Sequence, residues 1–489
     1  MEKQAFCIHG HFYQPPREDP LTGEIPIEPG AVPYKNWNER IYAQCYKPNA
    51  ELGNFERISF NLGPTLMRWM SSKYPSTLAR IINQDRKNLA AYGVGNAMAQ
   101  SYNHTILPLA RHHDKVTQVH WGIADFEYRF GHRPKGMWLP ETAIDLKTLQ
   151  VLADYGIEFT ILAPWQAETN NLDTTRVYWV SLARGMRMAV IFYDADLSSR
   201  ISFDPGATAN ADYFLQEILV PKFDRALYPG GETRIVTIAS DGELYGHHQP
   251  FRDQFLGYLL GKAIRGWDIE PTFPAYWIKK NPPQETIRIR DLTSWSCLHG
   301  VKRWMTACDC TPNSNWKLPL RRALNKLAAA LDKEYLGILS PLMNDPWQLR
   351  HRYIYVLCEQ VGLDELVGSM VHQKIEPELL RKIQVILAAQ YERQRMFTSC
   401  GWFFDDFDRI EPRNNVAYAA QAVYFTYLAT GVDLSGQAKE WLRPVVSWRT
   451  GLSAEIVFHE HYELTRNNPQ IHSWALNQSS MAFNSFMAW

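Results

Sequence analysis

Two carboxylates in this sequence stand directly after apolar stretches that are typical of buried β-strands. Glu141 follows residues 136–139, and Asp241 follows residues 235–239. Because parallel strands end at a common edge of their barrel, we expect both side chains at that edge. Cleavage of a glycosidic bond requires such a pair, one group to attack or stabilise the sugar carbon and the other to carry a proton. The pair makes an enzyme that acts on sugars the leading hypothesis.

Each carboxylate also has an ordinary structural interpretation. Glu141 follows Pro140 and would suit the first turn of a helix, where negative charge complements the helix dipole. Asp241 precedes Gly242 and would suit a turn. Glu243 is a further candidate for the acid, and the sequence barely separates it from Asp241. Two such positions, together with histidines at a third strand end, favour the catalytic interpretation.

The first predicted strand, residues 5–9, leads into a histidine pair. His9 and His11 are two positions apart and therefore face the same side of an extended chain. They could bind a metal, or they could hydrogen-bond sugar hydroxyls together with Gln14. No nearby Asp completes a recognisable ligand set, so we predict no metal and no cofactor here. His247 is a further candidate for substrate binding, although adjacent histidines on polar stretches are usually solvated.

Charge and aromatic content narrow the class of partner. The chain has 489 residues with 51 basic and 51 acidic side chains, so no net charge favours nucleic acid or an anionic membrane. Aromatic residues make up 13% of the chain, and 17 of them are Trp. Aromatic rings can stack on the apolar faces of sugars, although most of these rings are expected in the core. The composition fits a carbohydrate-binding protein that does not bind nucleic acid.

Cysteine usage and the N-terminus bear on location. The seven cysteines are scattered, and the only close pair, Cys308 and Cys310, is too tightly spaced for a CxxC motif. We therefore expect buried thiols. Residues 1–7 show no signal peptide, and no apolar run approaches the ~20 residues of a membrane span. The prediction is a cytoplasmic protein outside the membrane.

Alternating strand and helix patterns fill roughly the first 300 residues, which is typical of a parallel α/β barrel. After Pro282 and Pro283 the helical period dominates. We predict a barrel domain over residues 1–300 and a helical domain over residues 301–489. The expected strands are residues 5–9, 136–139, 159–162, 188–192 and 235–239, and the expected helices include residues 64–72, 75–91, 116–130, 146–155, 213–227, 318–335, 346–361, 377–397, 414–430, 434–450 and 453–466.

Three motifs resemble conserved regions of glycoside hydrolase family 57. They are residues 11–15, 138–141 and 241–246. The resemblance implies an incomplete (β/α)7 barrel followed by an all-α region. It also implies retaining action on α-glucan or maltooligosaccharide, as in amylases, 4-α-glucanotransferases and branching enzymes, without a metal or cofactor. By this resemblance Glu141 is the nucleophile and Asp241 the general acid/base, and the tail resembles a domain of unknown function found in one branch of the family.

The resemblance also suggests residues that shape sugar subsites. Trp138 precedes the nucleophile, and residues 294–300 resemble a fifth region that contains Trp295 and His299. In the tail, Trp402 could form a stacking wall, although a plug between domains is the commoner role for such a residue.

One departure from the family affects the expected specificity. Its second conserved region usually presents a Glu after a strand, whereas residues 93–100 of this chain offer Asn96 or Gln100. This loss of charge motivates a second hypothesis, a barrel that binds glucan without turning it over. A third is a metal-dependent deacetylase or mannosidase on a related barrel. The sequence does not predict the linkage that is cut or the oligomeric state.

Overall fold

The computed structural model describes residues 4–224, 233–371 and 375–476. The chain divides into two compact units whose segments interleave along the sequence. The predicted boundary near residue 300 stays a prediction. The first unit comprises Met1–Gln14, Ile27–Ser101 and Phe126–Trp295, and the second comprises Pro15–Pro26, Tyr102–Asp125 and Ser296–Trp489.

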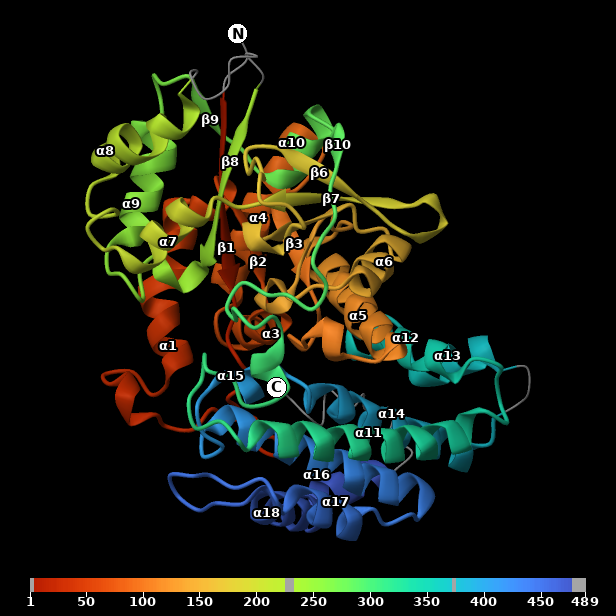
Figure 1. Cartoon of the computed structure of the whole chain (residues 1–489). Helices are drawn as coiled ribbons and strands as arrows, with labels where there is room; N and C mark the ends of the chain where they lie inside the picture. The colour runs from red at the N-terminus through yellow and green to blue at the C-terminus, as the bar shows by residue number, and fades with distance from the viewer. Residues whose placement is uncertain (1–3, 225–232, 372–374, 477–489) are drawn as a thin grey trace. The chain divides into compact units, whose positions relative to one another are not determined.

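Parallel strands form the main sheet of the first unit (Figure 1). Their order is β4-β3-β2-β1-β8, and β9 also pairs with β1. Every one of these pairings is parallel. The strands are β1 (Gln4–Phe12), β2 (Ser59–Leu62), β3 (Ala97–Gln100), β4 (Met137–Trp138), β8 (Ile235–Asp241) and β9 (Ile269–Pro271).

A second sheet extends the parallel barrel beyond β4. β5 (Phe159–Leu162) pairs in parallel with β7 (Arg187–Phe192), and a parallel bridge between Gly136 and Phe159 links β5 to the strand before it. Beyond β7 the N–H of Asp194 donates to the carbonyl of Thr237 in β8 at 2.7 Å. The parallel strands β8, β1 to β5 and β7 thus form the predicted incomplete barrel. Two edge strands complete the sheet, β6 (Val177–Ser181) antiparallel to β7 and β10 (Glu285–Thr286) parallel to β6.

Helices of the first unit begin at residues suited to that position. Pro64 and Pro75 open α3 and α4, where a missing N–H costs nothing. Asp145 caps α6 by accepting the N–H of Thr148, and Asp194 caps α7 in the same way. α7 packs against β8 (Figure 1). The helices are α1 (Trp37–Ile41), α2 (Lys47–Leu52), α3 (Pro64–Lys73), α4 (Pro75–Tyr92), α6 (Leu146–Asp154), α7 (Ala195–Phe203), α8 (Ala211–Tyr213), α9 (Arg252–Tyr258) and α10 (Pro274–Lys280), while α5 (His112–Phe130) spans both units.

The strands β2 and β3 are elements that the sequence patterns do not predict. Ser59 and Asn61 alternate with apolar residues in β2, and their side chains hydrogen-bond His9 and His11 of the neighbouring strand. The strand is fully buried although half of it is polar. A search for continuous apolar runs misses such a strand because its polar side chains are satisfied only by tertiary contacts.

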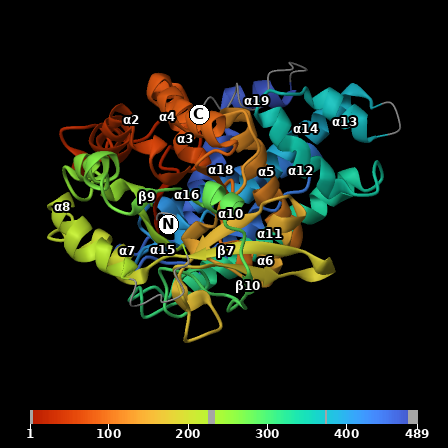
Figure 2. The ribbon, with the colours of Figure 1, turned by 90° about the horizontal axis from the view of Figure 1, so that it is seen from above.

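The second unit is helical, as predicted. The helices α11, α14 and α16 pack against one another and lie side by side in Figure 1, and Figure 2 shows the same helices from above. Residues 414–426 of α16 are buried on every face, so this helix lies at the centre of the unit. The helices are α11 (Lys317–Leu339), α12 (Pro346–Leu357), α13 (Leu363–Met370), α14 (Pro377–Arg395), α15 (Cys400–Phe403), α16 (Ile410–Thr430), α17 (Ser435–Leu442), α18 (Ala454–Arg466) and α19 (Pro469–Leu476).

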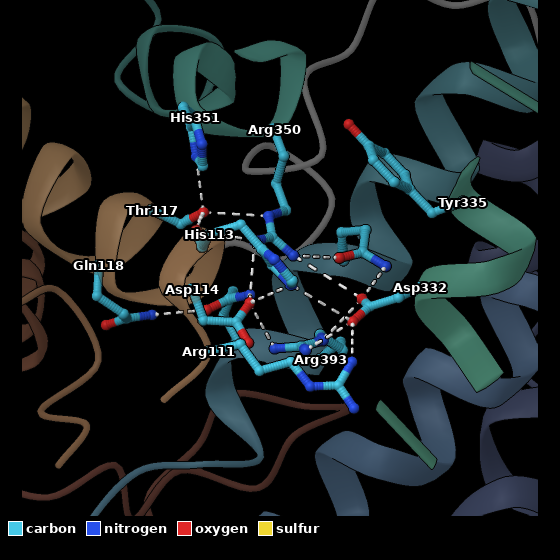
Figure 3. A network of polar contacts seen from close by, with 12 residues as sticks. Arg111, His113, Asp114, Thr117, Gln118, Asp332, Tyr335, Arg350, His351 and Arg393 are labelled. Atoms are coloured by element: carbon cyan, nitrogen blue, oxygen red, sulfur yellow. Dashed lines mark hydrogen bonds and ion pairs between the residues drawn. The ribbon is translucent and has the colours of Figure 1, made fainter. Parts of the chain in front are cut away.

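A buried ion network joins helices of the second unit (Figure 3). Arg350 and Arg393 each contact Asp114 at 2.9 Å. Arg393 also holds Asp332 with two hydrogen bonds, of 3.0 and 2.9 Å. Burial alone would raise the pKa of Asp332, but the charges of Arg393 and Arg350 outweigh it and hold that pKa well below its usual value. Both carboxyl groups of the network are therefore ionised partners of arginines.

Among the helices of the three described stretches, none has both the length and the apolar character that crossing a membrane requires.

Candidate active site

The strands β8, β1 and β4 carry the predicted site residues to one edge of the barrel. In the register of the sheet, Asp241 at the end of β8 lies opposite His11 of β1, and His11 lies opposite Asn61 of β2. Trp138 ends β4, and Glu141 follows it by three residues. The structure therefore brings together side chains that lie far apart in the sequence.

Glu141 has an unusual backbone conformation. Its φ and ψ are 58° and 21°, and the next residue, Thr142, has φ 48°. Left-handed conformations of this kind cost about 1–3 kcal/mol each for residues with a side chain, and they cluster at functional sites. The backbone N–H of Trp295 donates to the Glu141 carbonyl at 2.9 Å, and the indole Nε1–H donates to the carboxylate Oε2 at 3.0 Å. One residue thus fixes both the backbone and the side chain of Glu141.

Gln166 holds the same turn from the other side. Its Oε1 accepts hydrogen bonds from the Thr142 hydroxyl at 2.9 Å and from the Ala163 N–H at 2.8 Å. Its Nε2 donates to the Thr142 carbonyl at 2.9 Å and to the Thr293 hydroxyl at 3.1 Å. Because every hydrogen-bonding atom of the buried Gln166 amide has a partner, this side chain is held rigidly. It stabilises the strained turn at Glu141 and Thr142.

Asp241 is set up to keep a proton. Its side chain is reached by solvent, yet protein atoms surround the carboxyl group on most sides. This burial, with a further contribution from the negative charge of Glu141, raises the pKa of Asp241 from 3.8 to about 7. The charge of Glu141 therefore favours the protonated form of Asp241.

Glu243, the alternative acid, has different surroundings. Its side chain is buried, and its Oε1 accepts hydrogen bonds from the Tyr46 hydroxyl at 2.6 Å and from the Tyr13 N–H at 3.0 Å. Burial raises the pKa of Glu243 to about 8, although the Tyr46 hydrogen bond opposes the shift. Gln14 extends the chain, because its Nε2 donates to the Tyr46 hydroxyl at 2.8 Å.

The two histidines of the first strand are packed and neutral. His9 contacts the Ser59 hydroxyl at 2.9 Å, and His11 contacts the Asn61 side chain at 3.2 Å. Both rings stack on Trp138, with centroids 4.6 and 5.2 Å away. Burial lowers the pKa of His9 to about 3 and that of His11 to about 4. Trp138 is fully buried, so it supports these rings from within the core.

Aromatic residues that the sequence analysis does not single out adjoin the site. Tyr193, beyond β7, meets the Trp295 ring edge-on with centroids 6.4 Å apart. Trp165 meets Tyr193 at 6.1 Å, donates its Nε1–H to the Ser294 carbonyl, and leaves 42% of its surface exposed. An exposed ring held by its own hydrogen bond is suited to stack on a sugar. Its place after strand β5 is the signal that would have found it.

The remaining predicted residues have other partners. His247 contacts the Gln44 side chain at 2.7 Å through Nδ1. His299 and Trp402 belong to the second unit. His299 contacts cysteine sulfurs there, and Trp402 is fully buried beneath the guanidinium of Arg321, which lies 3.8 Å from the ring centroid.

Two amides stand where the family usually has an acid. Asn96 donates to the carbonyls of Phe55 and Ile58 and so ties β3 to its surroundings. Gln100 accepts the Asn61 amide at 2.8 Å. Both side chains therefore have structural partners, and Asn61 connects Gln100 to the histidine pair.

A parallel α/β barrel with two carboxyl groups at the ends of its strands is typical of glycoside hydrolases. The chain belongs to glycosyl hydrolase family 57, whose model matches residues 28–290. A domain of unknown function (DUF3536) matches residues 313–453. Both matches confirm the resemblance that the motifs and the tail predict.

Known proteins resemble this chain in sequence or in fold. Alpha-amylase 1 of Dictyoglomus thermophilum is 25% identical over 218 residues, which is 42% of this chain but only 29% of the amylase. An exo-type maltose-forming amylase from Pyrococcus sp. ST04 has the same fold, with a TM-score of 0.73 and 17% identity, over 99% of this chain and 93% of its own. A branching enzyme from Pyrococcus horikoshii has a TM-score of 0.60 at 14% identity over 98% of both chains.

Proposed function

We propose that this protein is a retaining α-glycoside hydrolase or transglycosylase that acts on α-glucan by double displacement. The observation that carries the proposal is the unequal pair at the barrel edge. Glu141 is held by the indole N–H of Trp295, while burial and the charge of Glu141 raise the pKa of Asp241 to about 7. Two carboxyl groups whose surroundings separate their protonation states can serve as nucleophile and acid at neutral pH.

In the first step, a Glu141 oxygen attacks the anomeric carbon as the glycosidic bond breaks. Asp241 gives its proton to the leaving oxygen, so the departing sugar leaves as a neutral alcohol. In the second step, Asp241 takes a proton from water or from a sugar hydroxyl. The oxygen so activated attacks the anomeric carbon and releases Glu141, and the two inversions give net retention.

Asp241 suits the proton-transfer role better than Glu243. A group that exchanges protons with substrate and water must be accessible, and Asp241 is exposed whereas Glu243 is buried. The hydrogen bonds from Tyr46 and Tyr13 occupy one oxygen of Glu243. We assign Glu243 to positioning the loop that follows Asp241.

The substrate assignment rests on the surroundings of the pair and on the family. Trp295 and Trp165 offer ring faces to a sugar, and His11 in β1, Gln14 after it and His247 after β8 supply polar groups. His9 stacks on Trp138 in the core. The printed names of the relatives, amylases and branching enzymes, favour α-glucan or maltooligosaccharide. A cytoplasmic location is proposed on the free state of all seven cysteines.

A screen of the full chain against maltoheptaose, amylose and pullulan tests the proposal. Proton NMR of the anomeric signal during the first minutes reports the configuration of the new reducing end, and product lengths separate hydrolysis from transfer. We expect α-configured products first. The variant Glu141→Gln should give little or no product. Its matched control is Glu168→Gln, which changes an exposed glutamate.

The outcomes separate the hypotheses. Release of β-configured products would contradict double displacement. Tight binding of maltoheptaose without any product would favour the non-catalytic glucan-binding barrel. Azide added to Glu141→Ala should restore turnover and yield a β-glucosyl azide, since the small anion takes the place of the missing nucleophile; equal turnover of this variant without azide would reject the nucleophile assignment.

A further inference from the structure

Two tight turns at the start of the helical unit present sulfur and nitrogen atoms to a common point. In the first, the Gly300 N–H donates to the Cys297 carbonyl at 3.0 Å, and Gly300 has φ 77°, which glycine adopts without strain. In the second, the Thr311 N–H donates to the Cys308 carbonyl at 2.7 Å. Each turn carries a potential ligand at its first and third positions, which places Cys297 and His299 opposite Cys308 and Cys310.

The distances between these atoms are those of a tetrahedron around one ion. The sulfurs of Cys297 and Cys308 are 3.6 Å apart, and His299 Nδ1 lies 3.2 Å from the Cys308 sulfur and 3.5 Å from the Cys310 sulfur. All four ligand atoms lie within 4.8 Å of one another. With Zn–S near ~2.3 Å and Zn–N near ~2.05 Å, a tetrahedral site has S···S edges of ~3.8 Å and S···N edges of ~3.5 Å.

Neither a disulfide nor ordinary core packing accounts for the cluster. A disulfide requires its sulfurs ~2.05 Å apart, and the Cys297 and Cys308 sulfurs at 3.6 Å are free thiols. His299 is exposed and Cys310 is only partly buried, so burial of apolar surface does not explain why they converge.

The surroundings supply what a metal–thiolate centre needs beyond its ligands. Backbone N–H groups of His299 and Arg303 hydrogen-bond the Cys297 sulfur, and that of Leu298 hydrogen-bonds the Cys310 sulfur. Such second-layer donors stabilise and orient ligands.

The charge of Lys317 also fits an anionic centre. This residue is fully buried, and within the described part of the chain its Nζ has no hydrogen-bond partner. Burial and the positive charge of Arg303 lower the pKa of Lys317 to about 7, and the sulfurs of Cys308 and Cys297 oppose this shift. A buried charge without a partner is costly. Three thiolates and one Zn²⁺ carry a net charge of −1, which the lysine would offset.

We propose that Cys297, His299, Cys308 and Cys310 form a closed, structural zinc site in the helical unit. Four protein ligands fill a tetrahedral shell and leave no open position for substrate, which is typical of structural zinc. Sulfur and imidazole ligands favour zinc over magnesium or calcium. His299 is then a metal ligand, and the site lies outside the carboxyl pair of the barrel.

The test is metal content and ligand chemistry of the full chain purified without chelator. Elemental analysis by inductively coupled plasma mass spectrometry should find about one zinc per chain. Replacement by Co²⁺ should give thiolate-to-cobalt charge-transfer bands in the near ultraviolet and the strong visible bands of tetrahedral cobalt. Removal of zinc by a chelator should lower the melting temperature, because binding energy in such sites is folding energy.

Cys310→Ser is the informative variant, since this ligand is only partly buried and its loss leaves no core cavity. It should lose most of the zinc and the cobalt charge-transfer bands. Cys358→Ser removes a buried thiol outside the cluster and should keep both. If Cys310→Ser fails to fold, the cobalt spectrum of the unaltered chain still decides the question.

Two results would overturn the proposal. One is a chain that is free of zinc and gives no charge-transfer bands with Co²⁺. The other is a chain whose mass is lower by two hydrogen atoms than that of the reduced protein, together with a peptide in which Cys297 and Cys308 are linked. This result would show that the pair forms a disulfide. Neither readout depends on sugar cleavage, so the result is independent of the proposed function.

Discussion

Two pairs of carboxyl groups in this chain have opposite electrostatic surroundings. Asp114 and Asp332 lie among arginines, and the charges of Arg393 and Arg350 lower the pKa of both despite burial (Figure 3). Asp241 instead lies near a second negative charge, that of Glu141, and burial with this repulsion raises its pKa to about 7. The first arrangement stabilises ionised carboxylates in the fold. The second keeps a proton ready for transfer, which is the requirement of acid catalysis.

Replacing the proposed nucleophile should abolish activity without loss of stability. Glu141→Gln should lower kcat/KM on maltoheptaose by roughly 10⁶-fold, as removal of a nucleophile does in other enzymes. The melting temperature should stay level or rise, because the change removes a negative charge that opposes Asp241. Steady-state kinetics and a thermal melt provide the two measurements, with Glu168→Gln as the control. A large loss of stability in Glu141→Gln would mean that this glutamate is structural.

Replacing a carboxylate of the other pair should have the reverse effect. Asp332→Asn leaves Arg393 buried with fewer partners, and breaking a buried pair costs about 3–5 kcal/mol of unfolding free energy. Urea denaturation measures this loss, while activity of the folded protein should persist. Glu365→Gln, an exposed position on α13, is the control.

A double variant sharpens the same prediction. Asp332→Asn combined with Arg393→Met should be less destabilised than the sum of the single changes, since neither partner is left charged and alone. Strict additivity would show that the two residues do not act as a pair.

A smaller effect is expected from Trp295. Trp295→Phe keeps an aromatic ring but removes the Nε1–H that donates to Glu141 at 3.0 Å. A hydrogen bond to a charged group contributes about 1.5–3 kcal/mol, so kcat/KM should fall by roughly tenfold or more. Trp165→Phe leaves Glu141 untouched and should change KM more than kcat. Equal kinetics of Trp295→Phe and the unaltered enzyme would remove the indole from the proposed mechanism.

The smallest and most diagnostic effect is on the pH dependence of stability. Between pH about 4 and about 7 the folded state holds a proton on Asp241 that the unfolded chain has released. This contribution therefore favours the folded state at low pH and is lost as pH rises through that window. Asp332 has the opposite sign, because its lowered pKa gives stability above its usual value of 3.8 that is lost as pH falls.

Melting temperatures measured across pH separate the two contributions. Asp241→Asn should reduce the decline of stability between pH 4 and 7, to which Glu243, with its pKa raised to about 8, also contributes. Asp332→Asn should reduce the loss of stability at acid pH. The activity of the unaltered enzyme should decline above pH about 7, where Asp241 loses its proton. The comparison would be contradicted if Asp241→Asn altered the pH dependence of the melting temperature at acid pH and Asp332→Asn altered it between pH 4 and 7.

The sequence was most informative where chemistry and secondary structure coincide. The apolar runs before Glu141 and Asp241 mark them as candidates, and the predicted helices over residues 64–72 and 75–91 match α3 and α4 closely. The described part of the predicted helix over residues 213–227 is instead a π-helical turn, Phe214–Leu219, followed by a 3₁₀ turn, Val220–Phe223, and residues 225–227 lie outside the described residues. Pro221 removes an α-helical hydrogen bond in this stretch, which ends a regular helix there.

Residues that depend on loop-to-loop contacts were not predictable in this way. Gln166 supports Thr142 from 24 positions away, and nothing in its own stretch marks that role. The cysteine cluster does not match a CxxC motif, because Cys308 and Cys310 are separated by a single residue and meet His299 from a different turn. Tertiary convergence makes both arrangements, so only coordinates reveal them.

The interleaving of the two units has a consequence for how this chain can be cut. The polypeptide passes from one unit to the other after residues 14, 26, 101, 125 and 295. Truncation after Trp295 would strip Glu18 of its ion pair with Arg395 and would remove Asn414, which holds the Pro16 carbonyl. Neither unit is a contiguous cassette, so a single genetic crossover could not have transferred one without the other, and limited proteolysis should not release either as a stable fragment.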